Sequence, residues 1–186
     1  LYTNSHTWAV TTGGGGNDVI YAYGEAHGGE GNDLIVLSSG YYGRPITGDE
    51  GDDEIRAGDA AVTVNGGIGD DRFVSGAGND TFDGASGVDT VSYENATARV
   101  SINLSTGAVA GNGSDTLTRV ENAIGGDFAD TIKGTNAANQ IDGGAGADVM
   151  NGLNGDDTYY VDHTGDVVTE SSSTGGLDTV IASVSV

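Results

Sequence analysis

The chain has no cysteine, a single proline and few basic residues among its 186 positions. Without cysteine there are no disulfide bonds, and with only three scattered histidines the usual ligands of zinc are scarce. Six Lys and Arg residues against 28 Asp and Glu give a formal charge of -22, which would repel nucleic acids and anionic membranes. No apolar stretch approaches the roughly 18 residues of a membrane-spanning helix. The lack of cysteine fits a protein stabilised by a metal rather than by disulfide bonds.

Glycine is abundant and regularly placed. The chain contains 34 glycines, and a nine-residue pattern that begins at Gly13 recurs almost to the C-terminus. Further copies begin at Gly28, Gly48, Gly66, Ser75, Gly84, Gly125, Gly143 and Gly152. Each copy has Asp at its sixth position and an apolar residue at its eighth, so the template is G-G-x-G-x-D-x-U-x. This composition suits one elongated repeat domain rather than a large globular core.

Each position of the repeat has a physical reason. Glycines at the first, second and fourth places allow positive φ and let the backbone turn so sharply that its carbonyl oxygens point inward. The Asp adds an anionic oxygen. Positions seven to nine alternate outward, inward and outward, as in a short strand with one buried side chain. The predicted buried residues are Ile20, Ile35, Ile55, Phe73, Phe82 and Val91. One repeat therefore predicts a loop and a strand, which together make half a turn of a coil.

The spacing of the aspartates predicts how the coils stack. Five of them, separated by 15, 20, 18 and 18 residues, fall on one edge of a solenoid because a coil takes about two repeats: Asp18, Asp33, Asp53, Asp71 and Asp89. Asp80 falls on the opposite edge, where the neighbouring half-turns lack ligands. In a second block we expect Asp115, Asp130, Asp148 and Asp166 on one edge, and Asn139, Asp157 and Asp178 on the other.

The spacing of the coils and the charge of the carboxylates indicate which metal ion would fit. Parallel strands lie about 4.8 Å apart, so carboxylates on successive coils are that close. At an effective dielectric constant near 20, two such charges repel by roughly 3 kcal/mol, and a cation relieves that repulsion. Calcium binds hard oxygens at about 2.3 to 2.6 Å, so two ligands facing each other across it span about the same distance as two coils. Magnesium, at about 2.0 to 2.1 Å, fits worse.

We therefore predict roughly five to nine calcium ions, held by loop glycines and by the aspartates and one asparagine. The candidate ligands are Gly14, Gly16, Asp18, Gly29, Gly31, Asp33, Gly51, Asp53, Gly67, Gly69, Asp71, Gly76, Gly78, Asp80, Gly87, Asp89, Asp115, Gly126, Asp130, Asn139, Gly144, Gly146, Asp148, Gly155, Asp157, Asp166 and Asp178. In two places the pattern departs from the template. Phe128 replaces a fourth-position glycine, and Asn139 replaces an aspartate.

These repeats resemble the repeats-in-toxin (RTX) family of hemolysin-type calcium-binding nonapeptides, over roughly residues 13–92 and 125–180. The resemblance implies an all-β fold, a right-handed parallel β-roll, with calcium held between turns by loop carbonyls and Asp carboxylates. It also implies type I secretion from a Gram-negative bacterium, and folding triggered by extracellular calcium.

Four segments are expected along the chain. Residues 1–12 are a capping strand that covers the open end of the first coil. Residues 13–92 form the first β-roll block and residues 125–186 the second. In the spacer 93–124, alternating apolar residues around Thr106 and Gly107 predict a β-hairpin that leaves the solenoid and caps the first block, braces the second or joins both.

Two surface features leave alternatives open. The outward residues Val19, Tyr21, Leu34 and Val36 predict an apolar patch near the N-terminal end, to be covered by residues 1–12, by a preceding domain or by a partner. An inserted half-turn carries Tyr41 and Tyr42, which would pack on their own coil or bind a protein or a polysaccharide.

No catalytic constellation is present in the sequence, so we expect a binding and structural module and no enzyme within these residues. The N-terminal residues lack a charged apolar leader and the last residues are typical of a further strand. We therefore expect a piece of a longer protein, secreted or displayed on the cell surface. That protein is either an adhesin, toxin or surface-layer component, or a secreted enzyme such as a protease, lipase or polysaccharide-modifying enzyme. The sequence predicts calcium as a partner and no nucleic acid.

Overall fold

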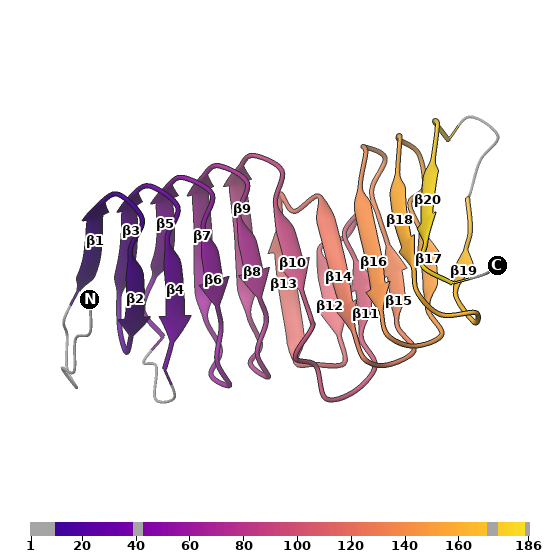
Figure 1. Cartoon of the computed structure of the whole chain (residues 1–186). Coiled ribbons are helices and arrows are strands. Elements are labelled where there is room, and N and C mark those ends of the chain that lie inside the picture. Colours follow the sequence, from indigo (N-terminus) through magenta and orange to yellow (C-terminus); the bar gives the residue numbers. More distant parts are fainter. Residues whose placement is uncertain (1–9, 39–42, 171–174, 185–186) are drawn as a thin grey trace.

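The fold is a parallel β-solenoid in which two long sheets face each other, as the computed structural model shows (Figure 1). The structure describes residues 10–38, 43–170 and 175–184. Within these ranges the chain forms strands, turns and bends but no helix. This confirms the predicted all-β parallel β-roll, and the coils follow one another in chain order along its length.

The nine-stranded sheet contains every second strand of the first block and continues without interruption into the second block. Its strands, in spatial order, are β2 (Val19–Ala22), β4 (Leu34–Leu37), β6 (Glu54–Arg56), β8 (Arg72–Val74), β10 (Thr90–Ser92), β14 (Asn122–Gly126), β16 (Gln140–Gly144), β18 (Thr158–Val161) and β20 (Thr179–Ala182). All eight neighbouring pairs are parallel.

The eleven-stranded sheet forms the other face and contains two additional strands at its centre. Its order is β1 (Thr11–Gly15), β3 (Ala26–Glu30), β5 (Ile46–Glu50), β7 (Thr63–Ile68), β9 (Thr81–Ser86), β13 (Ser114–Thr118), β12 (Ala108–Ala110), β11 (Ser101–Asn103), β15 (Thr131–Lys133), β17 (Val149–Asn151) and β19 (Val167–Val168). Strand β1 crosses residue 12, where we expected the cap to end. Residues 1–9 of the predicted cap lie outside the described residues, as do Tyr41 and Tyr42.

The hairpin is present but it does not leave the solenoid. Strand β12 is antiparallel to both β11 and β13, whereas β13 is parallel to β9 and β11 is parallel to β15. The spacer is therefore inserted into the eleven-stranded sheet and joins the two blocks (Figure 1). Leaving the sheet would have exposed the backbone edges of β9 and β15, which the meander instead pairs.

The core is a narrow column of side chains between the sheets, and register explains it. Ile20, Ile35, Ile55, Phe73 and Val91 are direct neighbours on successive strands. All five are fully buried, as is Phe82 from the other sheet, so the predicted core residues are confirmed. The rings of Phe73 and Phe82 stack across the column with centroids 5.3 Å apart. Burial of these eighth-position side chains fixes which face of each strand points inward, and so fixes the loops at the edges.

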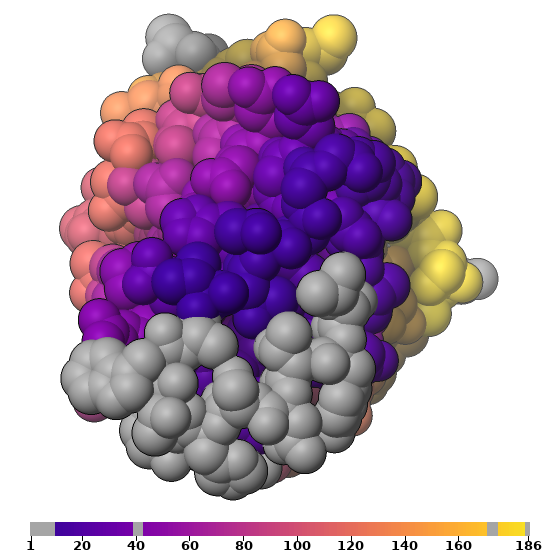
Figure 2. Space-filling model, turned by 90° about the vertical axis from the view of Figure 1, so that its left-hand side faces the viewer, coloured from indigo at the N-terminus to yellow at the C-terminus, as the bar shows by residue number. Residues whose placement is uncertain are grey.

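Figure 2 shows the molecule from its N-terminal end, with the first coils in indigo. Val19 and Tyr21 are 44% and 42% exposed, while Leu34 and Val36 are half-buried. The apolar patch therefore exists on the described surface. Further along the same sheet the outward positions carry charge, and Arg72 lies 3.6 Å from Glu54 on the neighbouring strand.

Candidate metal centre

The aspartates form two ladders, one on each edge of the solenoid, because each precedes a strand of fixed register. The first ladder precedes strands of the nine-stranded sheet and contains Asp18, Asp33, Asp53, Asp71, Asp89, Asn139, Asp157 and Asp178. The second precedes strands of the eleven-stranded sheet, or lies at their start, and contains Asp80, Asp115, Asp130, Asp148 and Asp166. The edges predicted from spacing are thus the edges that the fold builds.

In the rungs after Asp18, one side-chain oxygen accepts a hydrogen bond from a backbone amide. In the first ladder, Oδ1 of Asp53 accepts a hydrogen bond of 2.8 Å from the amide of Asp33, and Oδ1 of Asp71 accepts one of 2.9 Å from the amide of Asp53. The same bond, of 2.7 to 3.0 Å, joins Asp18 to Asp33, Asp71 to Asp89, Asp130 to Asp148, Asp148 to Asp166, Asn139 to Asp157 and Asp157 to Asp178. Each aspartate therefore points along the solenoid axis toward the preceding coil.

The other oxygen of five rungs has no partner within the described part of the chain. These are the Oδ2 atoms of Asp33, Asp53, Asp71, Asp148 and Asp157. The five residues are at most 3% exposed. A buried carboxylate oxygen without a hydrogen bond is costly, by several kcal/mol when it carries charge. Their shared geometry indicates a cation between coils.

The first glycine of each repeat leaves room around that oxygen. A Cβ added to Gly48 would overlap Oδ2 of Asp53 in its own repeat and the carbonyl oxygen of Gly66 on the next coil. Corresponding overlaps occur at Gly28, Gly125, Gly143 and Gly152, in each case with the Oδ2 of the aspartate five residues later. The missing side chain thus brings a carboxylate and a backbone carbonyl from adjacent coils together, which is the hard-oxygen donor set that calcium prefers.

The pKa values of the buried aspartates also favour a cation at these rungs. Burial raises the pKa of Asp71 from 3.8 to about 7, and the negative charges of Asp53 and Asp89 add to this effect. Burial likewise raises the pKa of Asp53, Asp148 and Asp157 to about 6, again with neighbouring carboxylates contributing. Without a cation these groups hold protons far more readily than ordinary aspartates, so a divalent ion would release protons as it binds.

Other rungs are satisfied by the protein itself. Oδ2 of Asp115 accepts hydrogen bonds from the hydroxyl of Tyr93 (2.7 Å) and from that of Ser75 (3.1 Å). Oδ2 of Asp130 accepts the amide of Gly126 at 2.7 Å. Oδ2 of Asp166 accepts the amides of residues 162 and 163. These rungs lack the open oxygen that characterises the other five.

Asp115 and Asp130 are not adjacent rungs, although spacing had placed them in sequence. Asp115 binds the amide of Asp80 at 2.8 Å, whereas the amide that binds Asp130 belongs to Val100. The inserted hairpin separates the two aspartates, because β12 and β11 lie between β13 and β15. Asn139 accepts the amide of Thr135 and donates to the carbonyl of Glu121, as an amide side chain does and a carboxylate does not.

The candidate glycine ligands divide by backbone conformation. Positive φ is found at Gly14, Gly16, Gly29, Gly31, Gly51, Gly67, Gly69, Gly87, Gly144, Gly146 and Gly155, whereas Gly76, Gly78 and Gly126 do not adopt it. The sequence analysis missed three residues that take the second glycine position with positive φ despite their side chains: Asp49, Ala85 and Leu153. Their phase in the repeat was the available signal. Glu121, which accepts the amide of Asp89 at 2.9 Å, was also missed.

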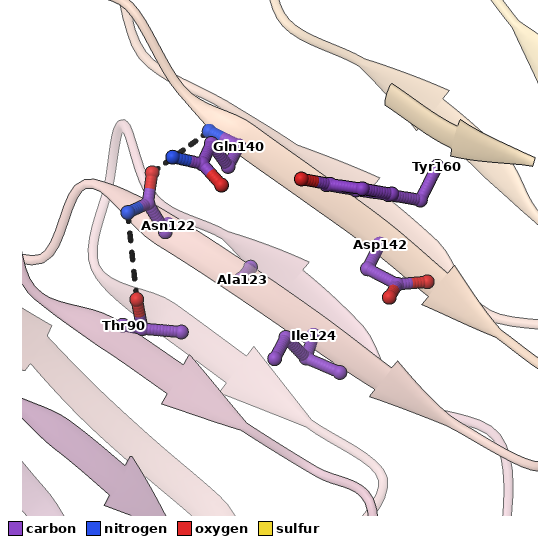
Figure 3. Close-up of a pocket in the computed structure, with 7 residues that line it drawn as sticks. All are labelled: Thr90, Asn122, Ala123, Ile124, Gln140, Asp142 and Tyr160. Carbon is purple, nitrogen blue, oxygen red and sulfur yellow. Dashed lines mark hydrogen bonds between the residues drawn. The ribbon is translucent and has the colours of Figure 1, made fainter. Parts of the chain in front are cut away.

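A shallow hollow of about 220 Å³ on the nine-stranded sheet is separate from the ladders (Figure 3). Asn122 and Thr90 are bonded to each other within it at 3.4 Å, and the amide of Gln140 donates to Asn122 at 2.7 Å. Asp142 and Tyr160 line its other end. Asp142, which lines the hollow, belongs to neither ladder.

Among the described residues, no helix is long and apolar enough to cross a membrane. A family model described as RTX calcium-binding nonapeptide repeat (4 copies) matches residues 47–82, 63–91 and 124–159. These segments carry most of the open rungs: Asp53, Asp71, Asp148 and Asp157 lie within them. No curated protein matches the chain.

Proposed function

We propose that this chain, which carries RTX calcium-binding nonapeptide repeats, is a calcium-binding module of a larger secreted or cell-surface bacterial protein that folds on extracellular calcium. One observation supports this most strongly. Five buried carboxylate oxygens have no hydrogen-bond donor within reach among the described residues, and at Asp33 and Asp53 a backbone carbonyl of the next coil borders the same space. A hard divalent cation supplies what they lack.

Calcium would be held at the open rungs by one carboxylate oxygen and by carbonyl oxygens of the adjacent coil. Its chemical contribution is positive charge, since about two charges per ion offset a chain of formal charge -22. The residues of the chain do the rest. The ladder amides orient each carboxylate through Oδ1, and the first glycines, which have no side chain, let Oδ2 lie close against the backbone. Folding and calcium binding are then one equilibrium.

The biological role that we favour is rigidity in an adhesin, toxin or surface-layer protein, without catalysis by these residues. The alternative is the C-terminal calcium-dependent module of a secreted protease, lipase or polysaccharide-modifying enzyme. The apolar patch at Val19 and Tyr21 supports contact with another part of the parent protein or with a partner. Sequencing the parent gene upstream of Leu1 distinguishes the two roles.

A calcium titration followed by circular dichroism tests the proposal. In excess chelator we expect a disordered chain, and with millimolar calcium a cooperative gain of β-structure. Asp71→Ala should raise the calcium midpoint by about tenfold, which is about 1.4 kcal/mol. Asp89→Ala should also raise it. Asp71 has a rung on each side, whereas Asp18 is the first rung of its ladder.

Asp18→Ala is the matched control, since it removes the same charge at the end of the ladder and should shift the midpoint less. At pH 8, a chain that is compact and β-rich in excess chelator, or an Asp71→Ala variant with the midpoint of the parent, would contradict the proposal.

A further inference from the structure

Among the described residues, the last rung of the first ladder stands apart because a third carboxylate joins it. Ligand oxygens of Asp157, Glu170 and Asp178 lie within 4.8 Å of one another. Glu170 belongs to no nonapeptide copy. Two ligands on opposite sides of a calcium ion lie about 4.6 to 5.2 Å apart, so the three oxygens are close enough to share one ion.

Register explains how Glu170 reaches this rung. Strands β17 and β19 pair Val149 with Val167 and Met150 with Val168, so Glu170 stands beside Gly152 on the next coil. In the coil before, Gly152 holds the equivalent place, and its carbonyl oxygen borders the space at Gly134. Glu170 therefore takes the position of a first glycine. It lies eight residues before Asp178, whereas Gly152 lies five before Asp157.

An unpartnered buried oxygen points into this group. Asp157 is 1% exposed and its Oδ2 has no hydrogen-bond partner in the described ranges. A Cβ added to Gly152 would overlap both this oxygen and the hydroxyl of Tyr159, so the two atoms border the same space. Oδ1 of Asp178 is held by the amide of Asp157 at 3.0 Å.

Tyr159 orients the added carboxylate. It fills the eighth position of its repeat, where other copies have Ile, Phe, Val or Met, and it is fully buried. Its hydroxyl accepts the amide of Gly152 at 2.6 Å and donates to Oε1 of Glu170. A buried phenol hydroxyl requires a hydrogen-bond partner, and Glu170 provides it for Tyr159.

We propose that Glu170 is a carboxylate ligand of a calcium ion shared with Asp157 and Asp178, and that Tyr159 is its positioning residue. This inference rests on the proposed function. The side chain of Glu170 adds a third carboxylate to this rung where the repeat pattern ends. Because calcium affinity rises with the number of charged ligands, this is the tightest site of the solenoid, and it closes the C-terminal end by fixing β20 to β18.

Calcium bound per chain, measured by equilibrium dialysis with atomic emission across a range of free calcium, tests the proposal. Glu170→Gln should lose the ion that binds at the lowest free calcium. Glu94→Gln is the matched control, because it removes the same charge from an exposed residue paired with Arg72. Hydrogen exchange localises the effect, since Glu170→Gln should lose calcium-dependent protection in β18 and β20 while β4 and β6 keep theirs.

Tyr159→Phe should keep the ion but bind it about tenfold more weakly, and combining it with Glu170→Gln should add nothing further. Equal binding curves for Glu170→Gln and the parent would overturn the inference while leaving the proposed function intact. A parent chain that binds no calcium would instead overturn the proposed function itself.

Discussion

At the scale of the residue, the site depends on a pairing of glycine and aspartate five positions apart. The aspartate uses Oδ1 for the amide of the preceding coil, and its Oδ2 occupies the space where the glycine has no side chain. The two residue types are therefore one unit. Neither residue type alone indicates a metal site, since glycine is also common in turns and aspartate is also common on solvated surfaces.

Gly48→Ala tests this unit. The added methyl group would overlap Oδ2 of Asp53 and the carbonyl of Gly66, so the calcium-loaded fold should lose about 1 to 3 kcal/mol. Gly15→Ala is the control, because its nearest neighbour would be Oε2 of Glu30 at 4.0 Å. Thermal unfolding in saturating calcium measures both variants. Equal melting temperatures would show that the space at Gly48 is not part of the site.

At the scale of the element, the meander β11–β12–β13 joins the blocks through a rung that does without an open oxygen. The hydroxyls of Tyr93 and Ser75 reach Oδ2 of Asp115 in a fully buried setting. Burial raises the pKa of Asp115, and the Tyr93 hydrogen bond opposes that rise. A hydroxyl thus satisfies this carboxylate as a cation would at the open rungs, so we expect no ion at this rung.

Tyr93→Phe should destabilise the fold by about 1 to 3 kcal/mol, because a buried carboxylate loses its donor. The number of calcium ions bound should not change. Tyr160→Phe is the control, since its side chain lies on the outer face and is 37% exposed. Denaturant unfolding in calcium gives the free energy and dialysis gives the stoichiometry. If Tyr93→Phe altered the stoichiometry, Asp115 would belong with the metal-dependent rungs.

At the scale of the whole molecule, repulsion along the ladders opposes the fold when calcium is absent. The raised pKa values of about 7 for Asp71 and about 6 for Asp53, Asp148 and Asp157 mean that the folded chain binds protons more readily than the unfolded chain. The proton-linked stability is complete below the unfolded value near 3.8. It is lost as the pH rises through 6 and 7.

In excess chelator, the β-structure seen by circular dichroism should therefore increase as the pH falls from 8 to 5. The buried carboxylates are then neutralised by protons in place of calcium. In the presence of calcium, low pH has the opposite effect on binding. Protons compete with calcium for the carboxylates, so the calcium midpoint rises at low pH. Added sodium chloride controls for general repulsion between surface charges. Equal β-content of the chelated chain at pH 5 and pH 8 would contradict the assignment of these aspartates as buried.

The nonapeptide determined much of this protein by itself. Period and alternation predicted the parallel coils, the core residues Ile55 and Phe73, and the two edges that carry the aspartates, because these are local consequences of turn geometry and a strand's twofold alternation. The repeat could not place the hairpin within the sheet, since pairing of β13 with β9 and of β11 with β15 joins residues distant in sequence.

Tertiary structure also decided which rungs are open. Whether an Oδ2 atom meets a hydroxyl, an amide or neither depends on the folded conformation around it, as the contrast between Asp115 and Asp71 shows. Glu170 gives the same lesson, because the register of β19 and the hydroxyl of Tyr159 bring it to Asp157. The repeat sets the spacing of the candidate ligands along the chain. Contacts in the folded chain then determine which carboxylate oxygens stay without a hydrogen bond and are available to a cation.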